Sequence, residues 1–275
     1  MRRSSERTRA AARIAGAALV LFALATGWAV SARAEDATDA PETLAQQQLN
    51  PLAGTIKLPA MLEFGFGVGP DRNVQPTLNF QPVIPFKLTE DWRIVTRSNL
   101  SIIHLPDPEE TTGLSDLDVS LFLTPAKSGP WVWGIGPIFE FPTATDTTLG
   151  TGKWSAGPTG ALVYVSGPWV NGIVVSQFWS FAGSGRRADV SLMQIEALLS
   201  YTFSSNWYVQ TDPTFVSDWK APSGQKWTVP IGIDIGKVVP IGTQSLSVQV
   251  GAYYNVAKPD GAADWILRAQ VMWAF

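Results

Sequence analysis

The sequence predicts an all-β protein, a single antiparallel transmembrane β-barrel of about twelve strands that follows a short helical or irregular segment. Three observations predict this fold. Apolar and polar residues alternate at period 2 in one segment after another, which is typical of strands with two different faces. Trp92, Trp131, Trp169 and Trp207 each begin a strand, at spacings of 39, 38 and 38 residues. The chain ends on an alternating strand whose last residue, Phe275, is aromatic.

The composition favours one large β domain. The chain has 275 residues, of which 45% are apolar and 16% are charged. It has no cysteine, which excludes disulfides and thiolate metal sites and suits an oxidising envelope. His104 is the only histidine, so a multi-histidine metal site is excluded. The segment 150–153 lacks the spacing of a phosphate loop. We therefore expect no metal and no cofactor.

Residues 1–34 have the three parts of a signal peptide: a basic start, an apolar stretch at 14–30 and the cleavage pattern Ala32-Arg33-Ala34. The alternative is an uncleaved anchor helix. Removing this segment takes away six Arg and one Glu, which leaves 14 basic and 22 acidic residues and a net charge near −8. Such a chain has no basic tract, which argues against nucleic acid as a partner. The basic start consists of Arg2, Arg3, Arg7, Arg9 and Arg13.

Residues 35–56 form an N-terminal segment that is first acidic and then rich in amides. Within it, 43–49 could form two helical turns. The segment either plugs the barrel mouth or hangs in the periplasm as a tether, and the sequence favours neither. The barrel itself is expected to occupy residues 57–275.

Each strand was assigned from its alternation and from the turn residues at its ends. The strand at 169–182 is ambiguous in register. The predicted strands are Leu58–Val68, Val74–Phe86, Trp92–His104, Asp116–Pro125, Trp131–Pro142, Trp154–Val165, Trp169–Ala182, Val190–Phe203, Trp207–Ser217, Trp227–Val238, Thr243–Val256 and Trp265–Phe275.

The apolar faces of these strands favour a membrane barrel over a soluble sandwich. In the assigned registers, no charged residue lies mid-strand on the apolar side. Closed barrels alone let strands span a bilayer with every backbone group paired, so the apolar side is expected to face lipid in a bacterial outer membrane. An even strand number places both termini on one side. The longer connections, expected outside the cell, are Pro106–Ser115, Thr143–Lys153, Gly183–Asp189, Asp218–Gln225 and Lys258–Ala263.

Aromatic residues at the strand ends are expected to form a girdle at the membrane interface, in contact with outer-membrane lipid. The last strand resembles the terminal strand of bacterial outer-membrane barrels, which ends in an aromatic residue. That resemblance implies recognition by the barrel-assembly machinery. The girdle residues are Trp92, Trp131, Trp169, Trp207, Trp273 and Phe275.

Charged residues on the opposite parity are expected to face the lumen. Arg93 and Arg97 form a basic wall that faces an acidic wall on later strands. Such charges either line a narrow path for a small solute or pair with one another to fill the interior. Glycines on the same parity either widen the lumen or relieve strain in coiled strands. The predicted lumen residues are Arg93, Arg97, Glu63, Glu140, Glu196, Asp212, Asp234 and Arg268, and the glycines are Gly65, Gly67, Gly134, Gly136, Gly157, Gly232 and Gly236.

An enzyme is not expected. No Gly-x-Ser-x-Gly motif occurs. His104 lies on the lipid parity near the outer rim, where a serine beside it would resemble the Ser–His pair of an outer-membrane phospholipase. The alternative is an amphipathic side chain at the interface.

Several motifs resemble outer-membrane transporter-like proteins related to the phenol meta-pathway degradation family, whose members are labelled as transporters or as neuromedin U. The resemblance covers residues 45–275. It implies a barrel and the passage of small, aromatic or apolar solutes through a transporter or narrow channel, and it implies no catalytic residue. The motifs are Gln81–Phe86 with Glu90–Trp92, Trp133–Pro137 with Phe141–Thr145, Lys153–Pro158, Gly167–Trp169 and Trp179–Gly183.

Overall fold

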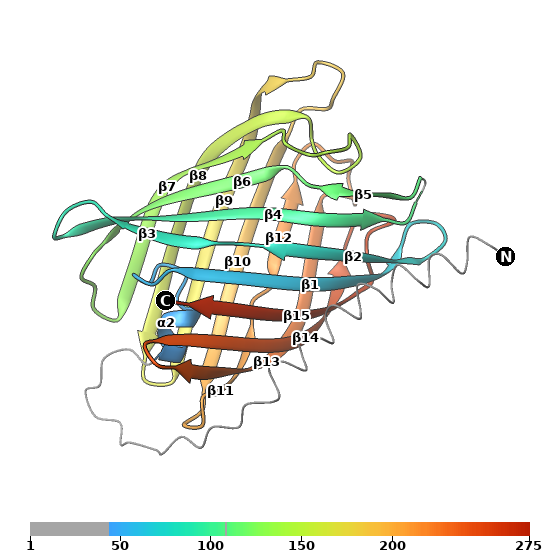
Figure 1. Ribbon diagram of the computed structural model, residues 1–275. Coiled ribbons are helices and arrows are strands. Elements are labelled where there is room, and N and C mark those ends of the chain that lie inside the picture. The colour runs from blue at the N-terminus through green and yellow to red at the C-terminus, as the bar shows by residue number, and fades with distance from the viewer. Residues whose placement is uncertain (1–43, 108) are drawn as a thin grey trace. The chain divides into compact units, whose positions relative to one another are not determined.

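The computed structural model describes residues 44–275 except residue 108 (Figure 1). The predicted signal peptide lies outside the described residues. A helix of six residues, α2 (Leu44–Leu49), precedes fifteen antiparallel strands. The strands are β1 (Lys57–Val68), β2 (Asn73–Phe80), β3 (Val83–Lys87), β4 (Trp92–Leu105), β5 (Thr111–Leu114), β6 (Leu117–Pro125), β7 (Trp131–Phe141), β8 (Lys153–Ser166), β9 (Trp169–Gly183), β10 (Ser191–Thr202), β11 (Trp207–Thr211), β12 (Thr214–Asp218), β13 (Trp227–Ile241), β14 (Gln244–Ala257) and β15 (Trp265–Ala274).

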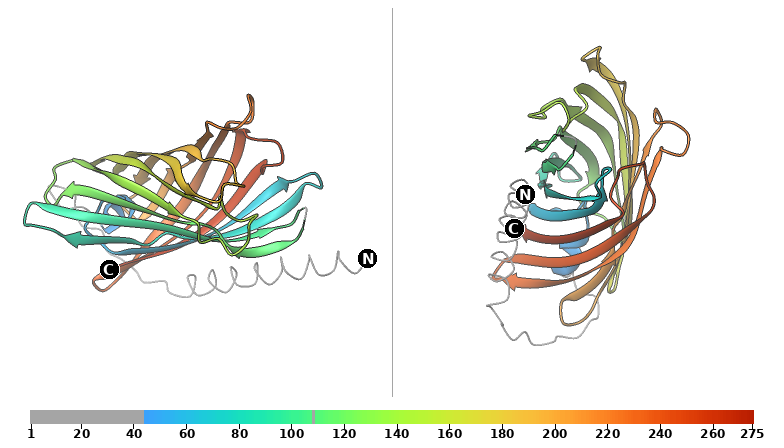
Figure 2. Two further views of the ribbon diagram at one scale, coloured as in Figure 1. Left: turned by 90° about the horizontal axis from the view of Figure 1, so that it is seen from above. Right: turned by 90° about the vertical axis from the view of Figure 1, so that its right-hand side faces the viewer.

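The strands close into a barrel, which confirms the predicted fold (Figures 1 and 2). The strands pair antiparallel around the whole ring, and β1 pairs with β15 from Lys57 opposite Ala274 to Phe66 opposite Trp265. Closure leaves the barrel without a free sheet edge, as a membrane requires.

The fifteen strands occupy twelve positions in the wall, because two predicted strands are interrupted and one predicted loop contains a strand. Pro82 separates β2 from β3, and Pro213 separates β11 from β12. A proline has no backbone N–H to donate, so it breaks a hydrogen-bonded ladder. The loop predicted at 106–115 was partly wrong, since β5 continues the wall by pairing with the end of β4.

The two faces of the strands differ as predicted. On β13, Ile231, Ile233 and Ile235 are exposed on the outside, whereas Asp234 between them is fully buried. The strand of ambiguous register, β9, places Ile173 and Val175 outside and buries Val174. On β9 and β13 the apolar parity therefore faces the surroundings of the barrel.

The interior is not polar throughout, because its inward face is apolar at one end of the barrel. At the short-turn end, where α2 lies, the inward positions are apolar because the chain's own N-terminal segment packs against them. Figure 2 shows α2 enclosed by the strands, and α2 contacts β9, β10 and β13. The inward-facing residues of this buried cluster include Val83, Val95, Phe122, Val132, Val163, Val170 and Val238.

Exposed aromatic residues form two rings, one near each end of the strands. The six predicted girdle residues lie at the short-turn end, and a second ring, which the sequence analysis did not assign, lies at the other. Trp169 and Trp179 are ten positions apart on β9. A rise of about 3.3 Å per residue and a tilt of about 40° separate them by about 25 Å along the axis, the height of a membrane-spanning apolar band. The second ring contains Phe141, Trp154, Trp179, Phe181, Trp219, Trp227, Tyr254 and Trp265.

In the described part of the chain, no helix is long and apolar enough to cross a membrane.

Candidate functional site

Residues 46–53, from α2 into the segment that follows it, contact the short-turn end of the barrel from inside. Gln46 donates a hydrogen bond to the carbonyl of Gly167, in the turn between β8 and β9, and Gln48 donates one to the hydroxyl of Ser245 on β14. Leu52 is almost fully buried, and its carbonyl accepts a hydrogen bond from Arg93 on β4, 2.9 Å away. The segment is thus tied to opposite sides of the ring.

The side chain of Leu52 packs against the backbone of Gly134. A Cβ atom on Gly134 would lie 3.2 Å from a methyl group of Leu52 and 3.1 Å from the Cβ of Phe122. Gly134 therefore makes room for the segment, which is a third role beside the two predicted for inward glycines. Two other inward glycines make room for rings of the wall: Gly236 lies under the ring of Tyr208, and Gly232 under that of Tyr253.

An ion pair crosses the interior between β4 and β10. Arg97 on β4 contacts Glu196 on β10 at 2.6 Å, although several strands separate β4 from β10 in either direction around the ring. Arg97 also donates to Gln81 at 3.2 Å. The Arg97 and Glu196 side chains remain 19% and 28% exposed, so the pair borders open space.

A second charged cluster lies against the wall formed by β13, β14 and β15. Arg268 donates through Nε to Asp234 at 2.7 Å and also pairs with Asp212. The hydroxyl of Tyr253 donates to Asp234 at 2.6 Å, and the guanidinium carbon of Arg268 lies 4.2 Å from the centre of the Tyr253 ring. Asp234 is fully buried, so this cluster joins neighbouring strands from inside.

The remaining predicted lumen residues have separate partners. Glu63 accepts a hydrogen bond from Asn79 at 2.6 Å and lies opposite Arg268 in the pairing of β1 with β15. Glu140 accepts from Thr151 at 2.9 Å near the long-loop end. The structure therefore joins Arg97 with Glu196 and Arg268 with Asp212 and Asp234, whereas Arg93 and Glu140 lie apart from both groups.

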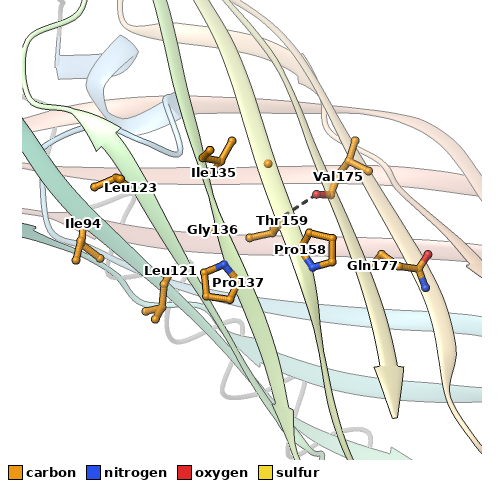
Figure 3. A pocket seen from close by; sticks show the side chains of 11 residues that line it. Ile94, Leu121, Leu123, Ile135, Gly136, Pro137, Pro158, Thr159, Val175 and Gln177 are labelled. Atoms are coloured by element: carbon orange, nitrogen blue, oxygen red, sulfur yellow. Dashed lines mark hydrogen bonds between the residues drawn. The ribbon is translucent and has the colours of Figure 1, made fainter. Parts of the chain in front are cut away.

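The outer surface of the barrel carries an apolar groove of about 850 Å³ over β6, β7, β8 and β9 (Figure 3). Beneath the groove, the strands of the wall lack some of their backbone hydrogen bonds. Backbone pairing is missing between 121–122 and 136–137, and again between 157–158 and 177–178. The hydroxyl of Thr159 instead donates to the carbonyl of Val175, 3.3 Å away. The groove is lined mainly by Ile94, Leu121, Leu123, Ile135, Pro137, Pro158 and Val175.

Prolines and glycines explain the groove. Pro137 lies directly opposite Pro158, and neither has an N–H to donate to a neighbouring strand. A Cβ atom on Gly136 would overlap the carbonyl oxygen of Leu121, so the two backbones touch where regular pairing stops. The alternation of apolar and polar residues did not predict this groove. Its available signal was a proline in the middle of two successive predicted strands, which is unusual in a sheet.

Among the described residues, no serine forms a hydrogen bond with His104, although the phospholipase alternative requires one. Its Nδ1 lies 2.7 Å from the hydroxyl oxygen of Thr112, and its Nε2 lies 3.9 Å from Glu110. In the described part of the chain, no group of three His, Asp or Glu residues is placed to hold a metal ion.

A closed barrel with an apolar outer face, two aromatic rings and a charged interior defines an integral membrane β-barrel. The structure of an outer membrane channel from Pseudomonas putida F1 is similar to this chain, with a TM-score of 0.61 over 81% of this chain and 96% of that one, at 13% identity. The NanC porin is similar with a TM-score of 0.51 over 80% and 98% of the two chains, at 11% identity. These similarities show a shared fold.

No family model matches the chain, and no curated protein sequence matches it. The narrower resemblance to the phenol meta-pathway degradation family therefore stays a prediction.

Proposed function

We propose that this protein is an outer membrane channel for small, aromatic or apolar solutes, closed in the observed state by its N-terminal segment. The division of the interior supports this proposal most directly. One half is polar and keeps the Arg97–Glu196 pair partly exposed, while the other half is sealed by residues 46–53. In a barrel that is filled for structural reasons alone, wall side chains block the lumen. Here a separate segment, which is not a strand of the wall, occupies the short-turn half, and Arg97 and Glu196 in the other half stay partly exposed.

The proposal includes an orientation. Bacterial barrels place short turns and both termini in the periplasm, so α2 and Phe275 lie at the periplasmic end and the longer loops lie outside the cell. A solute enters at the polar end and meets the Arg97–Glu196 pair before it reaches the N-terminal segment. Membrane lipid surrounds the two aromatic rings, and the barrel-assembly machinery recognises the last strand.

The apolar groove on the outer surface is the observation that supports apolar solutes as the molecules the channel passes. Its lining is almost wholly aliphatic, and it lies where two ladders of hydrogen bonds are interrupted. An apolar molecule in the lumen is separated there from the membrane by Phe122 and Phe178, which are buried behind the interruptions. A solute that passes into hydrocarbon there displaces these two rings and parts the strands at the positions where no ladder hydrogen bonds hold them.

Filling the groove tests this route. Ile135 is exposed on the groove, and Ile135→Trp adds an aromatic ring to it without adding charge. Uptake of N-phenylnaphthylamine, an apolar dye excluded by an intact outer membrane, is expected to fall to the rate of cells that lack the protein. Ile231→Trp, on the outer face of β13 away from the groove, is the matched control. Equal uptake by the two variants would contradict the route.

Substitutions in the Arg97–Glu196 pair test whether ions and solutes pass along the axis of the barrel. Arg97→Gln leaves the carboxylate of Glu196 without its partner, and the reversal potential across a planar bilayer with a KCl gradient is expected to shift toward cation selectivity. Glu196→Gln is expected to shift it toward anions, because the guanidinium then dominates the local field. Lys127→Gln, in the exposed turn between β6 and β7, is the control. If all three variants keep the wild-type potential, the filled structural barrel is the better description.

A further inference from the structure

A polar pocket of about 480 Å³ lies at the long-loop end, between the ends of β8, β9 and β10 and the loop after β12. It is separate from the apolar groove and from both charged clusters of the interior. Its lining combines two lysines with hydroxyl groups and two aromatic rings. The lining side chains that carry the argument are Lys153, Lys220, Ser180, Ser191, Trp179 and Phe181.

Positive charge dominates this pocket, although the predicted mature chain is acidic. Lys153 pairs with Asp189 at 3.0 Å, and Lys220 makes no ion pair with any described residue. Arg186 is exposed on the loop between β9 and β10 that borders the pocket. The lining itself therefore holds two lysines and one carboxylate. The hydrogen bond from Lys153, followed by the charges of Lys153 and Lys220, lowers the pKa of Asp189 below its usual range, so this carboxylate stays ionised and still leaves an excess of positive charge.

The aromatic rings fix the height of the pocket relative to the membrane. Trp179 and Phe181 are 51% and 69% exposed on the outer face of β9, within the second aromatic ring. Trp219 donates through Nε1 to Gln177 at 3.1 Å and extends this ring toward β12. Aromatic rings of barrels lie at the level of lipid headgroups. A cationic pocket that begins at this level meets the phosphates of the outer leaflet.

We propose that this pocket binds the phosphate headgroup of an anionic lipid of the outer leaflet. Lys220 and Arg186 contact the phosphate, the hydroxyl of Ser191 donates a hydrogen bond to it, and Phe181 packs against the apolar part of the lipid. Each cation near an anionic lipid surface strengthens binding about fivefold. Lipid binding at this site does not require that the barrel conducts solutes. A result that contradicts the channel proposal would therefore leave this proposal unchanged.

The test measures binding of diphosphoryl lipid A, the probe, to the purified full chain in neutral detergent by native mass spectrometry. Lys220→Gln with Arg186→Gln is expected to lower the apparent affinity about 25-fold, the product of two fivefold losses. Lys87→Gln with Lys127→Gln removes two exposed cations at the opposite end and is expected to leave it unchanged. Equal affinities for the two double variants would overturn the proposal.

A second arm separates a lipid from a free anion. Phe181→Ala is expected to weaken lipid A binding and to leave competition by inorganic phosphate unchanged, because phosphate has no apolar part. If inorganic phosphate alone displaces lipid A fully at millimolar concentration, and Phe181→Ala changes neither ligand, the pocket is a free-anion site and the lipid proposal is wrong.

Discussion

Replacing Leu52 by serine is expected to open the channel. Leu52 is almost fully buried beside Gly134, and it is the apolar anchor of the segment that occupies the short-turn end of the barrel. Loss of a buried leucine side chain costs about 2 to 3 kcal/mol, since both apolar burial and packing are lost. The substitution destabilises only the state in which the segment is bound inside the barrel. It therefore shifts the equilibrium from the closed toward the open state.

The size of the effect follows from this energy. Each 1.4 kcal/mol changes an equilibrium by about a factor of ten, so the open population is expected to rise about 30- to 150-fold. Single-channel records in planar bilayers measure it as open probability. Conductance per opening is expected to stay the same, because the barrel wall is unchanged.

The control for Leu52→Ser lies in the same segment. Ile56 is well exposed, and Ile56→Ser makes the same chemical change without emptying a buried site. Its open probability is expected to match the wild type. Arg93→Gln removes the hydrogen bond to the Leu52 carbonyl and is expected to act in the same direction as Leu52→Ser, more weakly. Equal open probability for Leu52→Ser and wild type would show that the segment is no gate.

The wall of this barrel could be predicted from sequence because lipid imposes one rule on every strand. A residue such as Ile233 must be apolar if it faces hydrocarbon. Its neighbour Asp234 must then face inward. Alternation at period 2 therefore identifies the outward and the inward face of a strand together. Alternation alone did not show the interruptions at Pro82 and Pro213. A proline keeps the apolar pattern intact while it removes one donor from the ladder.

Periodicity gives the side of the wall that a residue faces and leaves its partner undetermined. Arg93, Val95 and Arg97 all point inward from β4, and the sequence predicted one basic wall there. In the structure, Arg93 binds the N-terminal segment, Val95 packs in the apolar cluster, and Arg97 reaches across to Glu196. These differences arise from a segment more than forty residues earlier and from a strand on the far side, neither of which a local pattern contains.

Removing the carboxylate of Asp234 is expected to destabilise the barrel more than any other single charge change considered. Asp234 is 0% exposed and accepts hydrogen bonds from Arg268 and Tyr253, while the Arg268 side chain is itself only 8% exposed. Breaking a buried ion pair leaves an uncompensated charge, which costs about 3 to 5 kcal/mol. Asp212 stays beside Arg268 in Asp234→Ala, so the lower end of this range is expected.

Urea unfolding of the barrel in detergent micelles measures this cost. Glu90→Ala removes a carboxylate that is 82% exposed and pairs with Lys87 in a turn, and it is expected to change the free energy of unfolding by less than about 0.5 kcal/mol. The double variant Asp234→Ala with Arg268→Met is expected to be more stable than Asp234→Ala, because it buries no unpaired charge. An Asp234→Ala barrel as stable as Glu90→Ala would mean that Asp212 alone satisfies Arg268. The strands β13, β14 and β15 would then be held by their backbone ladder and not by the charged cluster inside.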